Sequence, residues 1–468
     1  MSIAKLMASS ANCQAQVVHA RVFGKLSGHA EVEETRVILP LGAIAQVADV
    51  LISCRLNACI DKLLPPVSGT FIGARPKTQA AEIAVAAQLW VEKSLDCGSI
   101  GALVQEDVRG HFDTLSIPSI MQWLLQHDVD AALVGAAIRA QMLPAILIQC
   151  QAAECRIVGR STGGLTGSRV AGSLARIPIE QTIADVAGMA GNQGFLAGSF
   201  RLTLASYVDN IFVLGKDGPS AVLIADKFEE LLAARWKQTI KPSSREIMVP
   251  KGALVGRVNV KRWKLVESMK VLGMSVQHNA ETDQSWKETE HAALGIFFRR
   301  AHSGLVKQLS NSSRHKTLNL TVKPYVLFRL TTTPLSETRV YQLEKMQRRM
   351  FNSIARVSQT DAESKNEFYK RKNALVSSNM KHSGLWHCAA ARQHLSFREH
   401  IKRSASRFEW AGVLDAWCDA GIAAARSVGG RLLRKWQGHV AQSWKLSEQV
   451  ALKHLNDTEA SQARRRTY

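Results

Sequence analysis

The sequence predicts an α+β protein, in which short strands end in acidic residues and longer helices complete the core. Three observations predict this class. Apolar residues alternate on both sides of a polar turn between Phe200 and Lys216, and a short apolar run typical of a buried strand begins at Ile100. After about residue 280, apolar residues recur with helical spacing. Strands are therefore expected in the first part of the chain and helices in the last.

A β-hairpin is predicted around the turn Tyr207-Val208-Asp209-Asn210, which separates two apolar runs. Asp209 would lie at its tip. A hairpin tip holds a carboxylate rigidly where a metal ion and a substrate can reach it. Asp-Asn pairs also form turns that have no function. This segment therefore indicates a functional site only in combination with the residues upstream.

A second acidic strand end is predicted at Asp107, which follows the apolar run from Ile100 to Val104. Ser116 and Pro118 then form a helix-start signal, because Ser caps helix N-termini and Pro suits the first turn. Asp107 is thus expected at the end of a strand that precedes a helix.

A glycine-rich segment, Gly159 to Ser168, lies between the two acidic strand ends, and a helical pattern follows from Val170 to about Val186. Glycine lets a backbone approach a ligand closely, and a helix N-terminus can hold phosphate. A flexible loop is the alternative for this segment.

Taken in this order, the motifs resemble the palm of a reverse transcriptase, most closely that of non-LTR (LINE-like) retrotransposons. Asp107 to Asp113 resembles the first palm motif of that family, with Phe112 as its aromatic residue. Gly159 to Ser168 resembles the glycine-rich second motif in part, and Tyr207 to Asn210 resembles the third, Tyr-x-Asp-Asp. The resemblance implies a right-hand polymerase fold with fingers, palm and thumb.

Further matches extend the resemblance over roughly residues 20 to 360. Ile240 to Arg245 looks like the family's Asn-Pro-x-Lys segment, with Arg245 in the place of the lysine. Met269 to Gly273 looks like the strand that grips the primer. Thr35 to Ile38 and Phe71 to Arg75 resemble stretches of the fingers.

The resemblance implies a metal site for nucleotide addition. Asp107 and Asp209 would be the carboxylates that hold two divalent ions, Mg²⁺ or Mn²⁺, and the backbone carbonyl of Val108 would be a further ligand. Asn210 stands where the family has a second Asp and would be a weakened third ligand, because an amide oxygen brings no charge.

The resemblance also implies substrate-binding residues. Arg36 would hold the triphosphate, and Phe112 would check the sugar and favour deoxynucleoside triphosphates. From the pattern alone, Phe112 could equally be a core aromatic. Thr162, Gly163 and Arg245 occupy positions that contact substrate in the family, although Thr162 replaces a Gln.

Two functions therefore stay open. The first is an RNA-directed DNA polymerase of a retrotransposon, a nucleotidyltransferase that acts on an RNA template and a DNA primer. The second is a catalytically inactive relic that still binds nucleic acid, which Asn210 and Thr162 motivate. A basic scaffold protein with accidental motifs is a third, minor reading.

The expected domains are a partial fingers region (1–98), a palm with the catalytic motifs (99–275), a helical thumb-like region (276–360) and a basic helical C-terminal region (361–468). Endonuclease and RNase H motifs are not evident. The chain is therefore expected to be a truncated part of an element's reading frame.

Composition agrees with a nucleic-acid partner. The 468 residues include 60 Lys and Arg against 39 Asp and Glu, a net charge of +21, and such a charge favours polyanions. The eight Cys form no CxxC pair and no secretory signal is evident, so a reducing location in the nucleus or cytoplasm is expected. The apolar run from Val129 to Cys150 is interrupted by charged residues, which predicts a core helix and a strand and no membrane contact.

Overall fold

The computed structural model describes residues 17–24, 35–73, 75–150, 153–197, 200–254, 258, 261–301, 303–331, 335–355, 357–405, 409–415, 450, 452–453 and 456. The chain divides into two compact units. Unit 1 comprises residues 1–78, 102–247 and 256–264, and unit 2 comprises residues 79–101, 248–255 and 265–468.

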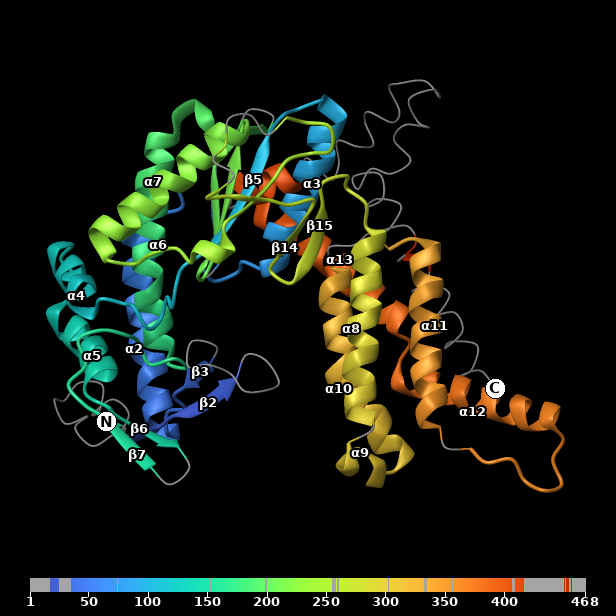
Figure 1. Cartoon of the computed structure of the whole chain (residues 1–468). Coiled ribbons are helices and arrows are strands. Elements are labelled where there is room, and N and C mark those ends of the chain that lie inside the picture. The colour runs from blue at the N-terminus through green and yellow to red at the C-terminus, as the bar shows by residue number, and fades with distance from the viewer. Residues whose placement is uncertain are drawn as a thin grey trace. The chain divides into compact units, whose positions relative to one another are not determined.

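Unit 1 is built on a mixed sheet (Figure 1). Its four central strands, in spatial order, are β5 (Ala102–Asp107), β11 (Asn210–Gly215), β10 (Leu204–Tyr207) and β4 (Thr70–Ile72). β11 pairs antiparallel with both β5 and β10, and β4 lies parallel to β10. The short strands β12 (Glu246–Met248) and β13 (Lys264–Leu265) continue the sheet beyond β5. The predicted hairpin and the predicted strand before Asp107 are both confirmed.

Two long helices, α6 (Arg169–Ala190) and α7 (Gly218–Trp236), pack against each other and on one face of this sheet (Figure 1). α7 contacts β5 and β11, whereas α6 contacts β4 and β10. Gly215 ends β11 where the backbone of α7 passes closely, since a Cβ there would lie 2.4 Å from the amide nitrogen of Ala221. Glycine is therefore required for this strand-to-helix packing.

Further helices cover α6 on its other side. They are α2 (Ala43–Leu63), α4 (Ile117–Gln126) and α5 (Ala131–Met142). Ser116 and Pro118 do begin a helix, and the run from Val129 to Cys150 folds as α5 and a strand, as predicted. By length and composition α2 could cross a membrane, a test that buried core helices also pass.

Small sheets complete unit 1. One joins β1 (Val17–His19), β6 (Ala145–Cys150) and β7 (Ala153–Ile157), and two ribbons join β2 (Arg21–Gly24) to β3 (Thr35–Ile38) and β8 (Phe195–Ala197) to β9 (Phe200–Leu202).

A buried carboxylate from α2 caps α6. Asp49 is 5% exposed and accepts hydrogen bonds from the hydroxyl of Ser168 at 2.5 Å and from the amide of Arg169 at 2.6 Å. A third bond comes from the amide of Val170 at 3.3 Å. These amides begin helix α6, and the Asp49 carboxylate already accepts their hydrogen bonds. They are therefore not free to bind the phosphate that the glycine-rich segment suggested.

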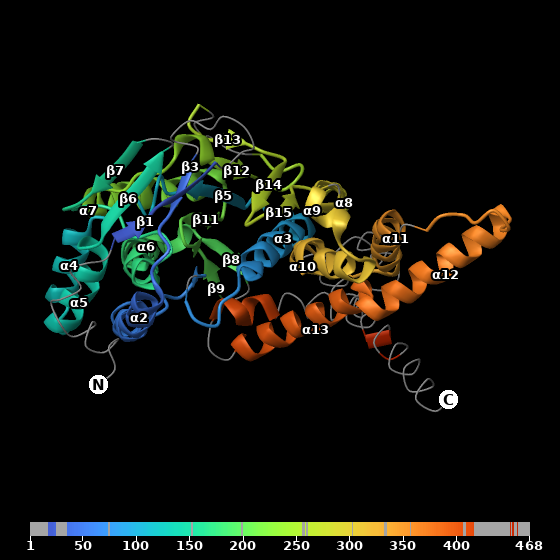
Figure 2. The same cartoon turned by 90° about the horizontal axis from the view of Figure 1, so that it is seen from below.

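Unit 2 combines one helix and one hairpin with a helical bundle (Figure 2). The helix α3 (Ala80–Cys97) packs on the hairpin of β14 (Ser268–Val271) and β15 (Met274–Gln277). The bundle consists of α8 (Asp283–Ala301), α9 (Gly304–Gln308), α10 (Asn311–Leu330), α11 (Glu337–Ile354), α12 (Lys365–Ser383) and α13 (Trp386–Ala405). Its core includes Trp286, Phe297, Phe351 and Trp386.

The units differ from the expected domain limits at 98 and 275, because α3 and the β14–β15 hairpin pack with the later helices. Two contacts illustrate this. Gln88 donates to the carbonyl of Ala280 at 3.0 Å, and His400 lies 2.8 Å from the Glu82 carboxylate.

We expect Asp49→Ala to lower the free energy of unfolding by about 2 kcal/mol, because it leaves a buried helix N-terminus without an acceptor. Urea unfolding followed by circular dichroism measures this. Asp130→Ala is the matched control, since Asp130 caps α5 at an exposed position and its loss should cost only about 0.5–1 kcal/mol. Equal losses in the two variants would contradict the importance of the buried cap.

Candidate active site

The two predicted acidic strand ends meet in unit 1. In the β5–β11 ladder, Asp107 stands directly opposite Asn210, and Asp209 precedes Asn210 in the turn. The amide of Val108 donates to the carbonyl of Asp209 at 2.9 Å. Since residues directly opposite each other project on the same side of a sheet, Asp107 and Asn210 share one face.

The turn that carries Asp209 is strained. Val208 has a φ of +59°, a conformation that β-branched residues rarely adopt. Next to it, the side-chain amide of Asn210 donates to a carboxylate oxygen of Asp209 at 3.1 Å. Backbone and side chain together thus restrict where Asp209 can point.

The segment from Ile240 to Arg245 holds the backbone of Asp107. The amide of Lys241 donates to the Asp107 carbonyl at 2.8 Å, and the amide of Asp107 donates to the hydroxyl of Ser244 at 2.9 Å. Val108 also forms an isolated bridge with Ile240. A third sequence motif therefore converges on the same strand end.

The glycine-rich segment packs on the residues that follow Asp107. The amide of Gly163 donates to the carbonyl of Leu115 at 2.9 Å, and that of Gly164 to the carbonyl of Phe112 at 2.8 Å. Gly163 has a φ of +84°, and a Cβ there would lie 3.2 Å from the Asp113 carbonyl. Thr162 is exposed and bridges to Ser116. Glycine at 163 is therefore required by both conformation and contact.

Arg245, expected to contact substrate, is bound within unit 1. Its guanidinium donates to both oxygens of Glu229 on α7, at 2.8 and 2.6 Å, and Arg262 also lies 2.8 Å from Glu229. Burial and the charge of Glu229 raise the pKa of the adjacent, fully buried Glu106 well above its usual range. Arg245 therefore balances a buried acidic cluster, which the sequence position alone did not indicate.

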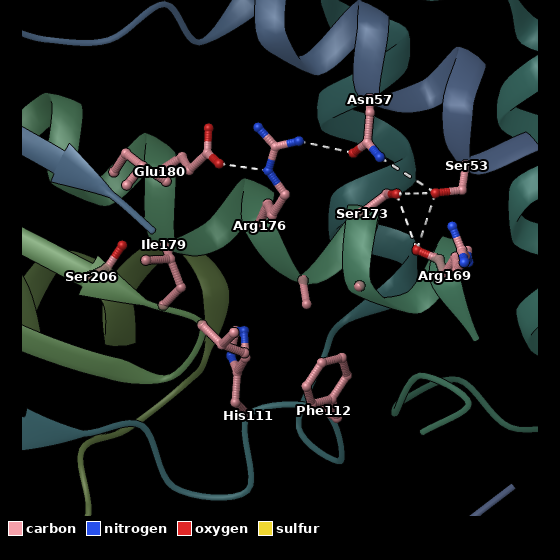
Figure 3. Close-up of a pocket in the computed structure, with 14 residues that line it drawn as sticks. Ser53, Asn57, His111, Phe112, Arg169, Ser173, Arg176, Ile179, Glu180 and Ser206 are labelled. Carbon is pink, nitrogen blue, oxygen red and sulfur yellow. Dashed lines mark hydrogen bonds and ion pairs between the residues drawn. The ribbon is translucent and has the colours of Figure 1, made fainter. Parts of the chain in front are cut away.

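A cavity of about 330 Å³ lies beside the Val208 turn (Figure 3). It is bounded by α2, α6, the segment after β5, and strands β4 and β10. Its lining residues on the helices are Ser53, Asn57, Arg169, Gly172, Ser173, Ala175, Arg176, Ile179 and Glu180, and on the sheet side Ile72, His111, Phe112, Ser206 and Val208.

The helical wall of the cavity is a satisfied polar network (Figure 3). Arg176 donates to Glu180 at 2.7 Å, to Asn57 at 2.9 Å and to Asp61 at 2.5 Å. Glu180 also pairs with Arg75 at 2.7 Å. The charges of the network neutralise one another. Its bonds from Arg176 join α6 to α2 and so shape the helical wall of the cavity.

Other lining groups are available to a ligand. Arg169 is exposed, and no described carboxylate pairs with its guanidinium. The Ser206 side chain lines the cavity although the residue is only 1% exposed. Neither residue was predicted; the only signal in the sequence was that Arg169 follows the glycine-rich segment.

Phe112, a predicted substrate-binding residue, and its neighbour His111 lie at the sheet side of the cavity (Figure 3). Their rings meet edge to face with centroids 5.5 Å apart. His111 also contacts the side-chain amide of Gln238 at 3.2 Å. Burial lowers the pKa of His111 in spite of the opposing charge of Asp209, so the imidazole is neutral at neutral pH.

Arg36 lies in β3, opposite Phe23 in β2. Its side chain falls outside the described part of the structure. The predicted role of Arg36 stays a prediction.

The donor set suits a hard divalent ion that a phosphate ligand helps to hold. Asp107 and Asp209 offer carboxylate oxygens, and Asn210 offers an amide. Among the described residues no group of three or more His, Cys, Asp or Glu could hold a metal ion unaided. Mg²⁺ commonly binds to one or two carboxylates together with substrate phosphates, so the residues fit that kind of site.

Comparisons with known proteins give structural neighbours only. No family model matches the sequence, and no curated protein matches it. Among solved structures, the telomerase of Candida albicans with a fragment of telomeric RNA is similar at a TM-score of 0.42 and 11% identity, over 89% of this chain and 67% of that one. The apo telomerase of Candida tropicalis is similar at a TM-score of 0.44 and 10% identity, over 86% and 70% of the two chains.

Gly163→Ala should destabilise unit 1 by about 2 kcal/mol, because it adds a contact with the Asp113 carbonyl to the strain of a positive φ. Gly159→Ala is the matched control. Gly159 also has a positive φ, +64°, but a Cβ there meets nothing within 4 Å, so about 1 kcal/mol is expected. Urea unfolding of both variants measures the difference, and equal losses would mean that the close approach at Gly163 imposes no constraint.

Proposed function

We propose that this chain is an RNA-directed DNA polymerase of the reverse transcriptase class, derived from a LINE-like retrotransposon. One observation carries the proposal. The β5–β11 register sets Asp107 beside the turn of Asp209, and the glycine-rich segment bonds to Phe112, which lines the cavity together with Val208 of that turn. The order of the motifs along the chain supports the same reading.

Asp107 and Asp209 would hold Mg²⁺ or Mn²⁺ with the phosphates of an incoming nucleotide. The bound ions supply activation of the primer hydroxyl and stabilisation of the leaving pyrophosphate. The protein contributes rigidity. Ser244 and Lys241 hold the backbone of Asp107, and Asn210 orients Asp209, so the carboxylates need little rearrangement before substrate binds.

The cavity would receive the sugar side of the incoming nucleotide. Phe112 offers an apolar surface for a sugar ring, while the hydroxyl of Ser206 offers a hydrogen bond. Arg169 supplies a positive charge to the lining of the cavity. A neutral His111 adds no charge there and leaves the two carboxylates as the acidic centre of the site.

The template and primer would be bound by cations. Unit 2 carries exposed basic residues along α8, α9, α10 and α11, namely Arg299, Arg300, Lys307, Lys316, Lys345 and Arg349. Contacts of this kind with phosphates make binding strong and dependent on salt.

A second function is favoured by two specific observations. Asn210 brings no charge because its side chain is an amide, and the nitrogen of that amide already donates to Asp209. Arg245 is held by Glu229. A relic without polymerase activity would keep the fold and still bind nucleic acid. It would lack a second carboxylate at position 210 and a free guanidinium at Arg245.

Asp107→Ala should lower primer extension on an RNA template by more than about 100-fold and weaken Mn²⁺ binding by at least about tenfold, because it removes one of two carboxylates. Primer extension measures the first effect, and electron paramagnetic resonance of bound Mn²⁺ measures the second. Glu230→Gln on α7 is the control, since it removes one exposed carboxylate, 64% exposed, outside the site.

The outcomes separate the two functions. Extension by the wild type that persists in Asp107→Ala would overturn the assignment of Asp107. Mn²⁺ and duplex binding without extension by the wild type would favour the relic. Extension gained in Asn210→Asp would then locate the defect at that one side chain.

Gly172→Ala should separate stability from nucleotide binding. Gly172 lies inside α6 and lines the cavity, and a Cβ there meets nothing within 4 Å. The methyl group should stabilise α6 by about 0.5–1 kcal/mol yet weaken binding of a deoxynucleoside triphosphate by roughly fivefold, because it occupies the cavity. Calorimetric titration measures the affinity.

Gly188→Ala is the matched control for this test. Gly188 lies in the same helix, is exposed and does not line the cavity. It should give the same gain in stability with unchanged affinity. Equal affinity in the two variants would exclude the cavity as the nucleotide site.

A further inference from the structure

The first half of α12 stands apart from the core of unit 2. In Figure 2 this helix extends beyond the other helices of its unit. Val376 and Met380, both in its second half, are the buried residues of α12, and no residue from Lys365 to Leu375 is buried. Arg348 of α11 contacts Ser377 at 3.1 Å and so meets the second half. We call residues 365–375 the α12 arm.

Local interactions hold the arm helical without support from the core. Ser364 and Glu367 form a reciprocal capping box, in which the amide of Ser364 donates to the Glu367 carboxylate at 2.9 Å and the amide of Glu367 donates to the Ser364 hydroxyl at 3.3 Å. Arg371 binds both oxygens of Glu363, at 2.8 and 2.6 Å. The arm is therefore formed before any partner arrives, which reduces the entropy cost of binding.

These same interactions leave the arm with uncompensated positive charge. Glu367 is bonded to the helix cap, and Glu363 is neutralised by Arg371. Lys365, Lys370 and Lys372 have no carboxylate partner among the described residues. The exposed carboxylates of Asp361 and Glu367 keep their charges, and together they do not balance the three lysines.

Two aromatic side chains lie among these cations. Lys372 and Arg371 each lie 5.9 Å from the centre of the Phe368 ring. Tyr369 is 58% exposed. Lys365, Tyr369 and Lys372 are spaced by four and three residues, so they lie along one side of the helix. Cations beside an exposed aromatic ring suit a chain of phosphates with accessible bases.

We propose that the α12 arm binds single-stranded nucleic acid, with its lysines on the phosphates and Tyr369 stacked on a base. RNA and single-stranded DNA share this chemistry. The proposal does not depend on polymerase activity, because no residue of the arm belongs to the candidate active site. The α12 arm would be a nucleic-acid-binding site separate from Asp107 and Asp209.

The test is binding of fluorescent 20-nucleotide oligo(U) and oligo(dT) to the full chain, measured by anisotropy over a range of salt. Replacing Lys365, Lys370 and Lys372 together by Ala should weaken binding by roughly tenfold or more at 0.1 M salt and reduce the slope of log K against log salt by about 2. Tyr369→Ala should weaken binding by about tenfold, and Tyr369→Phe should restore it.

The control removes three lysines of unit 1, the exposed Lys62 and Lys216 and the half-buried Lys227, which pairs with Glu230, and so changes the net charge equally. Circular dichroism establishes that each variant is folded. Equal affinity and equal salt slope in the two triple variants would overturn the proposal. An equal loss in Tyr369→Ala for oligo(dT) and for a duplex of the same length would overturn the single-strand assignment. A loss with oligo(U) alone would identify RNA as the strand bound, and an equal loss with both oligomers would identify recognition common to RNA and DNA.

Discussion

The candidate site depends on the register of a single strand pair. β11 lies against β5 so that Asn210 stands opposite Asp107, and this pairing brings the turn of Asp209 to the end of β5. A slip of one residue would turn alternate side chains to the other face and move the turn of Asp209 away from the end of β5. The paired strands bury apolar residues such as Leu103, Val104 and Val213.

The interface of α2 with α6 then determines the shape of the cavity. Asp49 caps α6 at its first turn, and Arg176 joins α6 to Asn57 and Asp61 on α2. These bonds are part-buried and charge-assisted, so they hold the two helices at one spacing. The cavity exists because small side chains, Gly172 and Ser173, face the opening that this spacing leaves. Helix packing thus bounds one side of the space offered to a ligand.

Local pattern predicted the elements of the site, and long-range packing decided its details. The hairpin at Asp209, the strand before Asp107 and the helix after Ser168 follow from alternation, turn residues and caps, which are properties of neighbouring residues. The partner of Arg245 is a glutamate on α7, and the cap of α6 comes from Asp49, 120 residues before the amide of Arg169. Such pairings depend on how distant helices meet, so spacing along the chain could not predict them.

The two compact units are interleaved along the chain, and this orders their folding during synthesis. α3 is made early but packs in unit 2, where Gln88 bonds to Ala280, 192 residues later, and Glu82 meets His400, 318 residues later. The apolar surface of α3 must therefore wait for most of the chain to leave the ribosome. Contacts of such separation form slowly and expose intermediates to aggregation, so a nascent chain of this protein depends on chaperones more than a domain with local contacts does.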